Sequence, residues 1–290
     1  MIKFDELVQS HVPDVVLYHA ECMDGFGAAW ALWKRFPQAR FVPVKHGFPQ
    51  PEGLDNQHVV MVDFSYHRDE ILALADRTAS LQILDHHITA QSALADLPFA
   101  YFDMDRSGAV LAWEWVHTQP VPWLLQYVQD KDLWRWQLPN SREISAALAS
   151  YPFDFSTWEQ FQFDTLKMEG TGILRHENSL IDKLAQEAIM ISLAGYTVPA
   201  VHSPVLASQI GERLATHHAF GVIWHQKDGR RYFSLRSKSG GISVSEIAAK
   251  YGGGGHTHAA GFSLPIGNTS SSLLNPALDF PVPSSPVHFS

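Results

Sequence analysis

The sequence predicts an α/β protein in which a parallel-sheet N-terminal domain is joined by a helical connector to a smaller α/β domain. Three observations support this fold class. Short apolar runs alternate with helical segments between residues 14 and 134, and such alternation is typical of a largely parallel sheet covered by helices. A helical pattern follows from about 155 to 194, and after Gly195 the sequence pattern becomes that of short strands. The charge also differs, because residues 196–265 carry seven Lys or Arg against three acids in a chain of net charge −9.

Composition sets the outer bounds. The chain has 290 residues, enough for one large or two ordinary domains, and 46% apolar with 18% charged residues is typical of a globular protein. No run reaches the roughly 18 apolar residues that a membrane span needs, and the N-terminus lacks the apolar core of a secretory signal. The single cysteine, Cys22, excludes an intrachain disulfide. We therefore expect a cytoplasmic protein.

The elements of the first domain follow in chain order. The segment 25–37 predicts a helix that ends before Pro37, because helical geometry is disfavoured for the residue that precedes a proline. Apolar runs bounded by turn residues predict the strands, and the intervals between them predict the helices. The predicted strands span 14–20, 39–44, 58–64 and 81–87, and the predicted helices span 25–37, 67–79, 107–118 and 121–134.

The second domain shows shorter elements. We expect strands at 196–203, 220–226 and 230–237, then a helix at 243–251 with Ser243 or Ser245 near its N-cap. The segment after 266 is rich in Ser, Pro and Asn, and we expect it to be unpacked. The predicted organisation is thus a domain at 1–154, a connector at 155–195, a domain at 196–265 and a tail at 266–290.

Carboxylates and imidazoles recur where the predicted strands end. His19 and Asp24 follow the first strand, Asp63 ends a later one, residues 85–87 read Asp-His-His, and Asp130 lies on a downstream helix. Ligands of open parallel sheets bind at the carboxyl ends of the strands. Mixed carboxylate and imidazole ligands suit Mn²⁺, Fe²⁺ or Zn²⁺ better than Ca²⁺. Two such ions about 3.5–4 Å apart are a known device for phosphoryl chemistry.

Each of these residues also has an ordinary structural explanation. A strand-end Asp often caps the next helix, and adjacent histidines can simply lie on the surface. Asp130 can be a surface charge of its helix, and Asp132 fits that description better still. Their recurrence at the ends of alternating strands favours a metal site.

A glycine run near the C-terminal end, Gly252, Gly253, Gly254 and Gly255, is followed directly by His256. Glycines let backbone N–H groups approach phosphate oxygens without obstruction by Cβ. A flexible linker is the alternative, but the flanking segments SEIAAKY and AAGF resemble ordered structure. We therefore expect an anion-binding segment here.

The segment LDHH at 84–87, together with GGGGHTHAAGF at 252–262, resembles the DHH phosphoesterase superfamily, in the branch that carries the DHH-associated C-terminal domain. The resemblance covers about residues 14 to 264. It implies a Mn²⁺-dependent phosphoesterase with two ions, for which Mg²⁺ can substitute. It also implies an active site in the cleft between the two domains.

The resemblance assigns roles to individual residues. It implies that Asp63 bridges both ions and that Asp85, His86 and His87 act close to the reaction, with His87 facing the leaving group or the scissile phosphate. Arg236 and the segment from Gly252 to His256 match substrate-holding positions. The metal ligands that the resemblance implies are His19, Asp24, Asp63, His86 and Asp130.

The first metal motif departs from the family pattern. Many relatives carry DGD, whose second Asp is a ligand, whereas this chain has DGF with Phe26 at that place. Glu21 or Cys22 could substitute for the missing ligand. Otherwise one ion is weakly held.

We expect a short substrate. The chain has no room for the additional oligonucleotide-binding domain of RecJ-like members, and a net charge of −9 argues against tracking along DNA. Short oligonucleotides of two to five nucleotides, bisphosphorylated nucleotides, cyclic dinucleotides and short polyphosphates are the candidates. A phosphomonoesterase or polyphosphate-type hydrolase, and a nucleotide-binding regulator with a weakened metal site, stay open as alternatives. Relatives often form homodimers.

Overall fold

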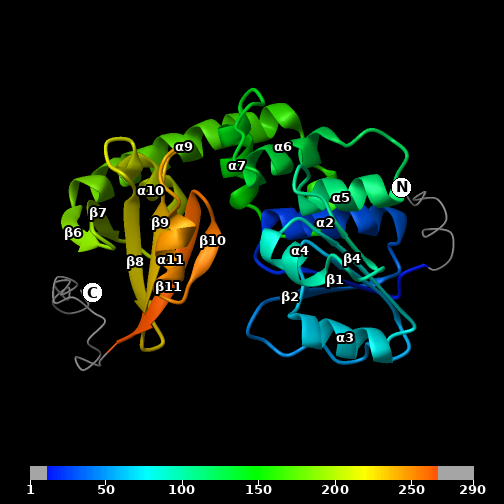
Figure 1. The fold of residues 1–290 in the computed structure, drawn as a ribbon. Helices are drawn as coiled ribbons and strands as arrows, with labels where there is room; N and C mark the ends of the chain where they lie inside the picture. The colour runs from blue at the N-terminus through cyan, green and yellow to red at the C-terminus, as the bar shows by residue number, and fades with distance from the viewer. Residues whose placement is uncertain (1–11, 267–290) are drawn as a thin grey trace, which may run out of the picture. The chain divides into compact units, whose positions relative to one another are not determined.

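The computed structural model of the protein describes residues 12–266, which belong to two compact units (Figure 1). The first unit ends at Leu174 and the second begins at Arg175. Apart from Ile266, the predicted tail lies outside the described residues. Among residues 12–266, no helix has both the length and the hydropathy of a membrane-spanning segment.

The first unit contains a five-stranded sheet in which all strands run parallel, in the order β2-β1-β3-β4-β5. The first four strands match the predicted ones, whereas the three residues of β5 form too short a run to be recognised. The strands are β1 Val15–His19, β2 Arg40–Val44, β3 His58–Val62, β4 Ser80–Asp85 and β5 Ala100–Phe102.

Successive side chains of a strand point to opposite sides of the sheet, and both sides of this sheet are buried. Val16 and Val60 pack with α2, α5 and α6, while Leu17 and Met61 pack with α3. Figure 1 shows α2 and α5 on one face of the sheet and α3 on the other. The helices of this unit are α2 Met23–Arg35, α3 Arg68–Arg77, α4 Ile88–Leu94, α5 Gly108–Val116, α6 Trp123–Asp132, α7 Ser141–Ala149 and α8 Phe155–Glu159.

The helical connector is confirmed, but it ends earlier than expected. Helix α9, Phe163–Gln186, is followed by strand β6, Ile189–Leu193, so the prediction of helix up to 194 is wrong for its last residues. Strand β6 pairs antiparallel with β7, Tyr196–His202. Ala194 and Gly195 join the two strands with φ values of 51° and 88°. Positive φ at both positions is the geometry of a tight hairpin turn, which outweighs the helical pattern before it.

The second unit is built on a six-stranded mixed sheet in the order β10-β11-β9-β8-β7-β6, in which only β7 and β8 are parallel. Ser243 is the N-cap of α11, and its Oγ accepts from the backbone N–H of Glu246 at 3.4 Å. The remaining elements are β8 Gly221–Lys227, β9 Arg230–Arg236, β10 Gly254–His256, β11 Ala259–Pro265, α10 Ala207–Ala215 and α11 Val244–Ala249.

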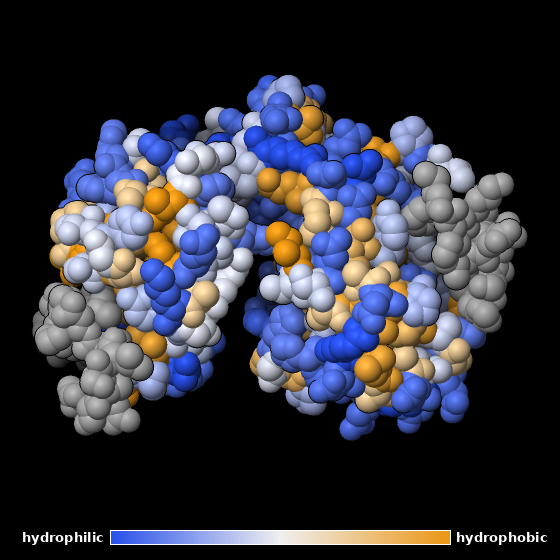
Figure 2. All heavy atoms as spheres, in the orientation of Figure 1, coloured by the Kyte–Doolittle hydropathy of each residue, from blue (hydrophilic) through white to orange (hydrophobic). Residues whose placement is uncertain are grey.

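Part of the glycine run is a strand rather than a loop. Gly254, Gly255 and His256 form β10 and pair antiparallel with Gly261, Ala260 and Ala259 of β11. The run is therefore held at the edge of the second sheet. Each unit also has its own apolar core, and Figure 2 shows hydrophilic residues over much of the visible face of both units, with apolar residues interspersed. The predicted fold class is confirmed.

Candidate metal centre

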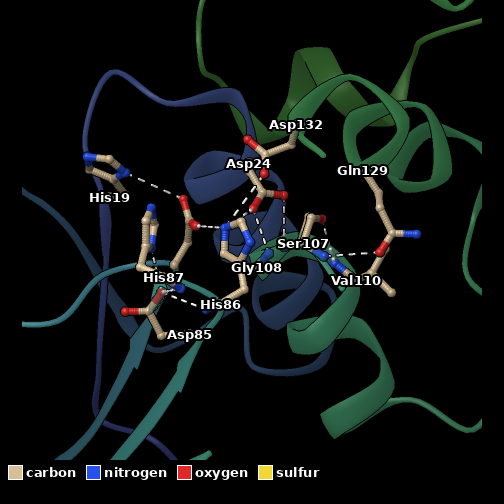
Figure 3. Close-up of polar contacts among 12 residues, drawn as sticks. His19, Asp24, Asp85, His86, His87, Ser107, Gly108, Val110, Gln129 and Asp132 are labelled. Atoms are coloured by element: carbon tan, nitrogen blue, oxygen red, sulfur yellow. Dashed lines mark hydrogen bonds and ion pairs between the residues drawn. The ribbon is translucent and has the colours of Figure 1, made fainter. Parts of the chain in front are cut away.

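The carboxyl edge of the parallel sheet gathers the polar side chains that were expected there (Figure 3). His19 is the last residue of β1, Asp63 directly follows β3, and Asp85 ends β4 immediately before His86 and His87. Strands β1, β3 and β4 are neighbours in the sheet. Their ends therefore bring these five residues together.

Asp63 faces two different neighbours. Its Oδ1 lies 3.1 Å from His86 Nε2, and its Oδ2 lies 3.6 Å from His19 Nδ1. Its backbone φ is 55°, a left-handed conformation that is uncommon outside glycine and that occurs often at functional sites. The residue is 1% exposed. The two oxygens of this carboxylate thus face two different imidazoles.

Potential ligand atoms form three overlapping groups, with the atoms of each group within 4.8 Å of one another. The first holds His19, Cys22 and Asp63, the second Asp63, His86 and His87, and the third Asp24, His86 and Asp132. Figure 3 shows Asp24, His86 and Asp132 pointing toward one another, with His19 further away. His19 and Asp24, which share one sequence motif, thus fall into different groups.

Asp24 connects the centre to the start of α5. Its Oδ2 accepts from Gly108 N at 2.6 Å and its Oδ1 from Ala109 N at 3.0 Å. A Cβ at Gly108 would lie only 2.5 Å from Asp63 Cβ, so this close approach needs glycine. The N-terminus of a helix favours negative charge. Helix α5 therefore stabilises the carboxylates of this edge.

The centre concentrates negative charge in a buried place. Burial, together with the charges of Asp132 and Asp63, raises the pKa of Asp24 well above its usual range. Burial and the charge of Asp63 also raise the pKa of Asp132. Burial opposes a charge on His86, but the hydrogen bond to Asp63 and the three carboxylates together raise the pKa of His86 to about 10. The carboxylates thus attract positive charge into the cluster.

The structure brings Asp132, rather than Asp130, into this cluster. Asp132 is the last residue of α6, and its Oδ2 lies 3.6 Å from His86 Nε2. The carboxylate of Asp130 accepts from the backbone N–H groups of Gln137 and Leu138 at 3.0 and 3.1 Å. Asp130 therefore holds the turn after α6, and the expectation that Asp132 is a surface charge is corrected.

Asp85 is used as a support for the residues after it. Its Oδ1 accepts from His86 N at 2.7 Å and bonds to His87 Nδ1 at 2.7 Å, while its Oδ2 accepts from Ser65 Oγ at 2.6 Å. Burial tends to lower the pKa of His87, but the bond to Asp85 raises it. Asp85 thereby fixes both the backbone turn and the ring of His87.

These residues fit divalent cations. Asp63 Oδ2 and His19 Nδ1 are buried polar atoms that make no hydrogen bond among the described residues. Buried polar groups are normally satisfied, so this pair is unusual without a further partner. Carboxylate and imidazole donors suit Mn²⁺, Fe²⁺ and Zn²⁺. Metal binding by His19, Asp24, Asp63 and His86 stays a prediction.

The structure explains the departure at Phe26. The Phe26 ring is 2% exposed, stacks on Phe153 and Phe155, and contacts Trp158 edge-on, with ring centroids 4.9–5.2 Å apart. It fills the core beside α2 and offers no ligand. Glu21 forms an ion pair with Lys45, and its side chain is 77% exposed.

In the second unit, the guanidinium of Arg236 is partly buried. Its Nη1 donates to Leu235 O at 2.9 Å and its Nη2 to Ser208 Oγ at 3.0 Å. Burial lowers the pKa of Arg236, and within residues 12–266 no carboxylate forms an ion pair with it. A partly desolvated cation of this kind suits an anionic ligand. The glycines Gly252, Gly254 and Gly255 and His256 are exposed, while Gly253 is half-buried.

Comparison with known proteins identifies relatives of both parts of the chain. A family model described as the DHHA1 domain matches residues 188–276. Uncharacterized protein R106 of Acanthamoeba polyphaga mimivirus is 30% identical over 284 residues, covering 87% of this chain and 67% of that protein. Oligoribonuclease NrnB of Bacillus subtilis (strain 168) is 28% identical over 156 residues, covering 48% of this chain and 38% of that protein.

Two solved structures share the fold. A pGpG-specific phosphodiesterase, PggH from Vibrio cholerae, superposes with a TM-score of 0.50 at 14% identity and covers 87% of this chain and 93% of that one. An exopolyphosphatase-related protein from Bacteroides fragilis superposes with a TM-score of 0.53 at 12% identity and covers 89% of each chain. At these identities the likeness concerns the fold alone.

Proposed function

Because the chain belongs to the DHH phosphoesterase superfamily and carries its DHHA1 C-terminal domain, we propose that it is a divalent-metal-dependent phosphodiesterase. Its substrates are short oligonucleotides or small nucleotide phosphodiesters. The ions are Mn²⁺, with Mg²⁺ as a substitute.

The position of Asp63 between His19 and His86 carries this proposal. His19 and His86 approach its two oxygens from different sides, at 3.6 and 3.1 Å. Asp63 is shared by the group that holds His19 and the group that holds His86 and His87, and His86 also belongs to the group of Asp24 and Asp132. Two bound ions would supply an activated water and neutralise charge on the phosphate.

The side chains around the ions orient the substrate. Asp85 holds His87 through Nδ1, which directs the opposite ring atom, Nε2, to the scissile phosphate or its leaving oxygen. The start of α5 holds Asp24 through two backbone N–H groups. Partners that fix a ligand in this way commonly change metal affinity or activity about 10–100-fold.

A short nucleotide substrate is supported by three observations. The Bacillus relative is named an oligoribonuclease. The net charge of −9 disfavours long nucleic acids, which bind to basic surfaces. In the second unit, Arg236 is a cation without a carboxylate partner among the described residues. The backbone of the exposed glycines Gly252, Gly254 and Gly255 is not covered by side chains of their own. We assign phosphate binding to Arg236 and to the run from Gly252 to His256.

A substrate panel tests the proposal. The purified chain is incubated with dinucleotides, 3′-phosphoadenosine phosphate, cyclic dinucleotides and tripolyphosphate, each with Mn²⁺, with Mg²⁺ and with a chelator. We expect metal-dependent cleavage of the dinucleotides, with Asp63→Asn as the inactive control. Cleavage of 3′-phosphoadenosine phosphate alone would instead indicate a phosphomonoesterase, and cleavage of tripolyphosphate alone would indicate a polyphosphate-type hydrolase. Binding without any turnover would indicate a nucleotide-binding regulator.

A further inference from the structure

The side chain of Cys22 lies in the candidate metal centre, beside His19 and Asp63. It occupies the N-cap position of α2, where Ser, Thr, Asp or Asn would accept a hydrogen bond from the helix, and its side chain makes no such bond. It is the only cysteine of the chain. Its sulfur therefore takes part in no intrachain disulfide.

The surroundings of Cys22 point to a cation. Its sulfur, a ring nitrogen of His19 and an oxygen of Asp63 all lie within 4.8 Å of one another. The Asp63 side chain is 1% exposed, and its Oδ2, the oxygen on the His19 side, has no hydrogen-bond partner among the described residues. Three donor atoms thus converge, and one of them is a buried carboxylate oxygen that needs a partner.

The neighbouring residues cannot take this role. Glu21 is turned toward Lys45 and is largely exposed. Phe26, at the place where relatives carry a second Asp, is packed among Phe155 and Trp158. In the turn between β1 and α2, Cys22 is the residue that can replace the missing carboxylate.

We propose that Cys22 Sγ is a thiolate ligand of the cation held by His19 and Asp63, so that this position favours a thiophilic divalent ion such as Zn²⁺ or Co²⁺ over Mg²⁺. The inference rests on the proposed function, because it requires the metal centre. Thiolate, imidazole and carboxylate together form a three-ligand set that suits zinc and leaves a fourth position open for water or substrate. The group of Asp24, His86 and Asp132 contains no sulfur and accepts Mn²⁺ or Mg²⁺.

Cobalt spectroscopy on the full chain tests the thiolate. Co²⁺ is titrated into the metal-free wild type, into Cys22→Ser and into Glu21→Gln, and absorption is recorded in the visible and the near ultraviolet. A near-ultraviolet sulfur-to-cobalt band requires a thiolate. Visible bands report Co²⁺ of low coordination number whatever the ligand, and equilibrium dialysis counts bound Co²⁺ in any geometry. We expect both kinds of band in the wild type and in Glu21→Gln, and loss of the ultraviolet band alone in Cys22→Ser. Circular dichroism checks that each variant is folded.

The outcomes separate this inference from the proposed function. Bound Co²⁺ without the ultraviolet band in the wild type would overturn the role of Cys22 and leave the metal centre intact. Absence of bound Co²⁺ in equilibrium dialysis of the wild type would overturn the metal centre and with it the proposed function. Equilibrium dialysis gives a second readout. Cys22→Ser should lower the affinity for one Co²⁺ by more than about 10–100-fold, the loss that is typical when a residue that only supports a metal ligand is removed. Equal binding in the two proteins would contradict the assignment.

Discussion

Replacing Gly254 by alanine distinguishes two reasons for a glycine at this position, namely folding of the chain and binding of the substrate. A Cβ at Gly254 would meet nothing within 4 Å, and its φ lies outside the left-handed region. The fold therefore tolerates alanine there, and the lower entropy of the unfolded chain should raise the free energy of unfolding by about 0.4–1 kcal/mol. If the backbone here binds a phosphate, the added methyl group obstructs it.

The expected effect on binding equals the contribution of one hydrogen bond between the backbone and the phosphate. A hydrogen bond to a charged group contributes about 1.5–3 kcal/mol, so KM for a dinucleotide should rise about 10–150-fold. Gly253→Ala is the contrasting variant, because its Cβ would lie 2.1 Å from Gly261 O and 2.5 Å from Phe262 Cβ. We expect it to lose about 1–3 kcal/mol of stability through overpacking.

Urea unfolding and steady-state kinetics measure the two quantities on the same proteins. Gly172→Ala is the matched control, since a methyl group added to this residue of α9 would also meet no atom within 4 Å. It should gain about 0.5–1 kcal/mol of stability with unchanged KM. An unchanged KM in Gly254→Ala would refute the assignment of the glycine run to phosphate binding.

Four further variants test the two units. Asp63→Asn should lower kcat by at least about 10²-fold, as the loss of one strong electrostatic contact to the transition state does, and calorimetry should find weaker Mn²⁺ binding; wild-type turnover would contradict the bridging role. Asp132→Asn should weaken Mn²⁺ binding by more than about tenfold, whereas Asp130→Asn should leave it unchanged and cost about 1–3 kcal/mol in urea unfolding; the reverse pattern would restore Asp130 as the ligand. Arg236→Ala should raise KM more than it lowers kcat, because the side chain holds ground state and transition state alike; an unchanged KM would remove Arg236 from the substrate site.

The strands of the first unit were predictable because burial on both faces gives continuous apolar runs, such as His58–Val62. Their ends then indicated His19, Asp63 and His86 as neighbours. Strand β6 could not be recognised, since its residues continue a helical pattern and only the turn at Ala194 and Gly195 reverses the chain.

The choice between Asp130 and Asp132 shows where sequence reasoning stops. Residues two apart on a helix point about 200° away from each other, so only one of them can reach the cluster. Which one does so depends on the rotation of α6, which is set by the packing of Leu124, Leu125 and Val128. The positions of the acidic residues in the sequence do not determine that rotation.

The aromatic stack around Phe26 limits how the centre can be redesigned. Restoring aspartate at this position, to recreate the DGD motif of relatives, would remove ring contacts with Phe153, Phe155 and Trp158. Loss of a buried phenylalanine costs about 3–5 kcal/mol, and an unpaired charge in an apolar core costs more. That sum approaches the whole stability of an ordinary domain. The motif cannot be transplanted into this chain by a single substitution, and protein engineering of its metal specificity has to begin at the β1–α2 turn.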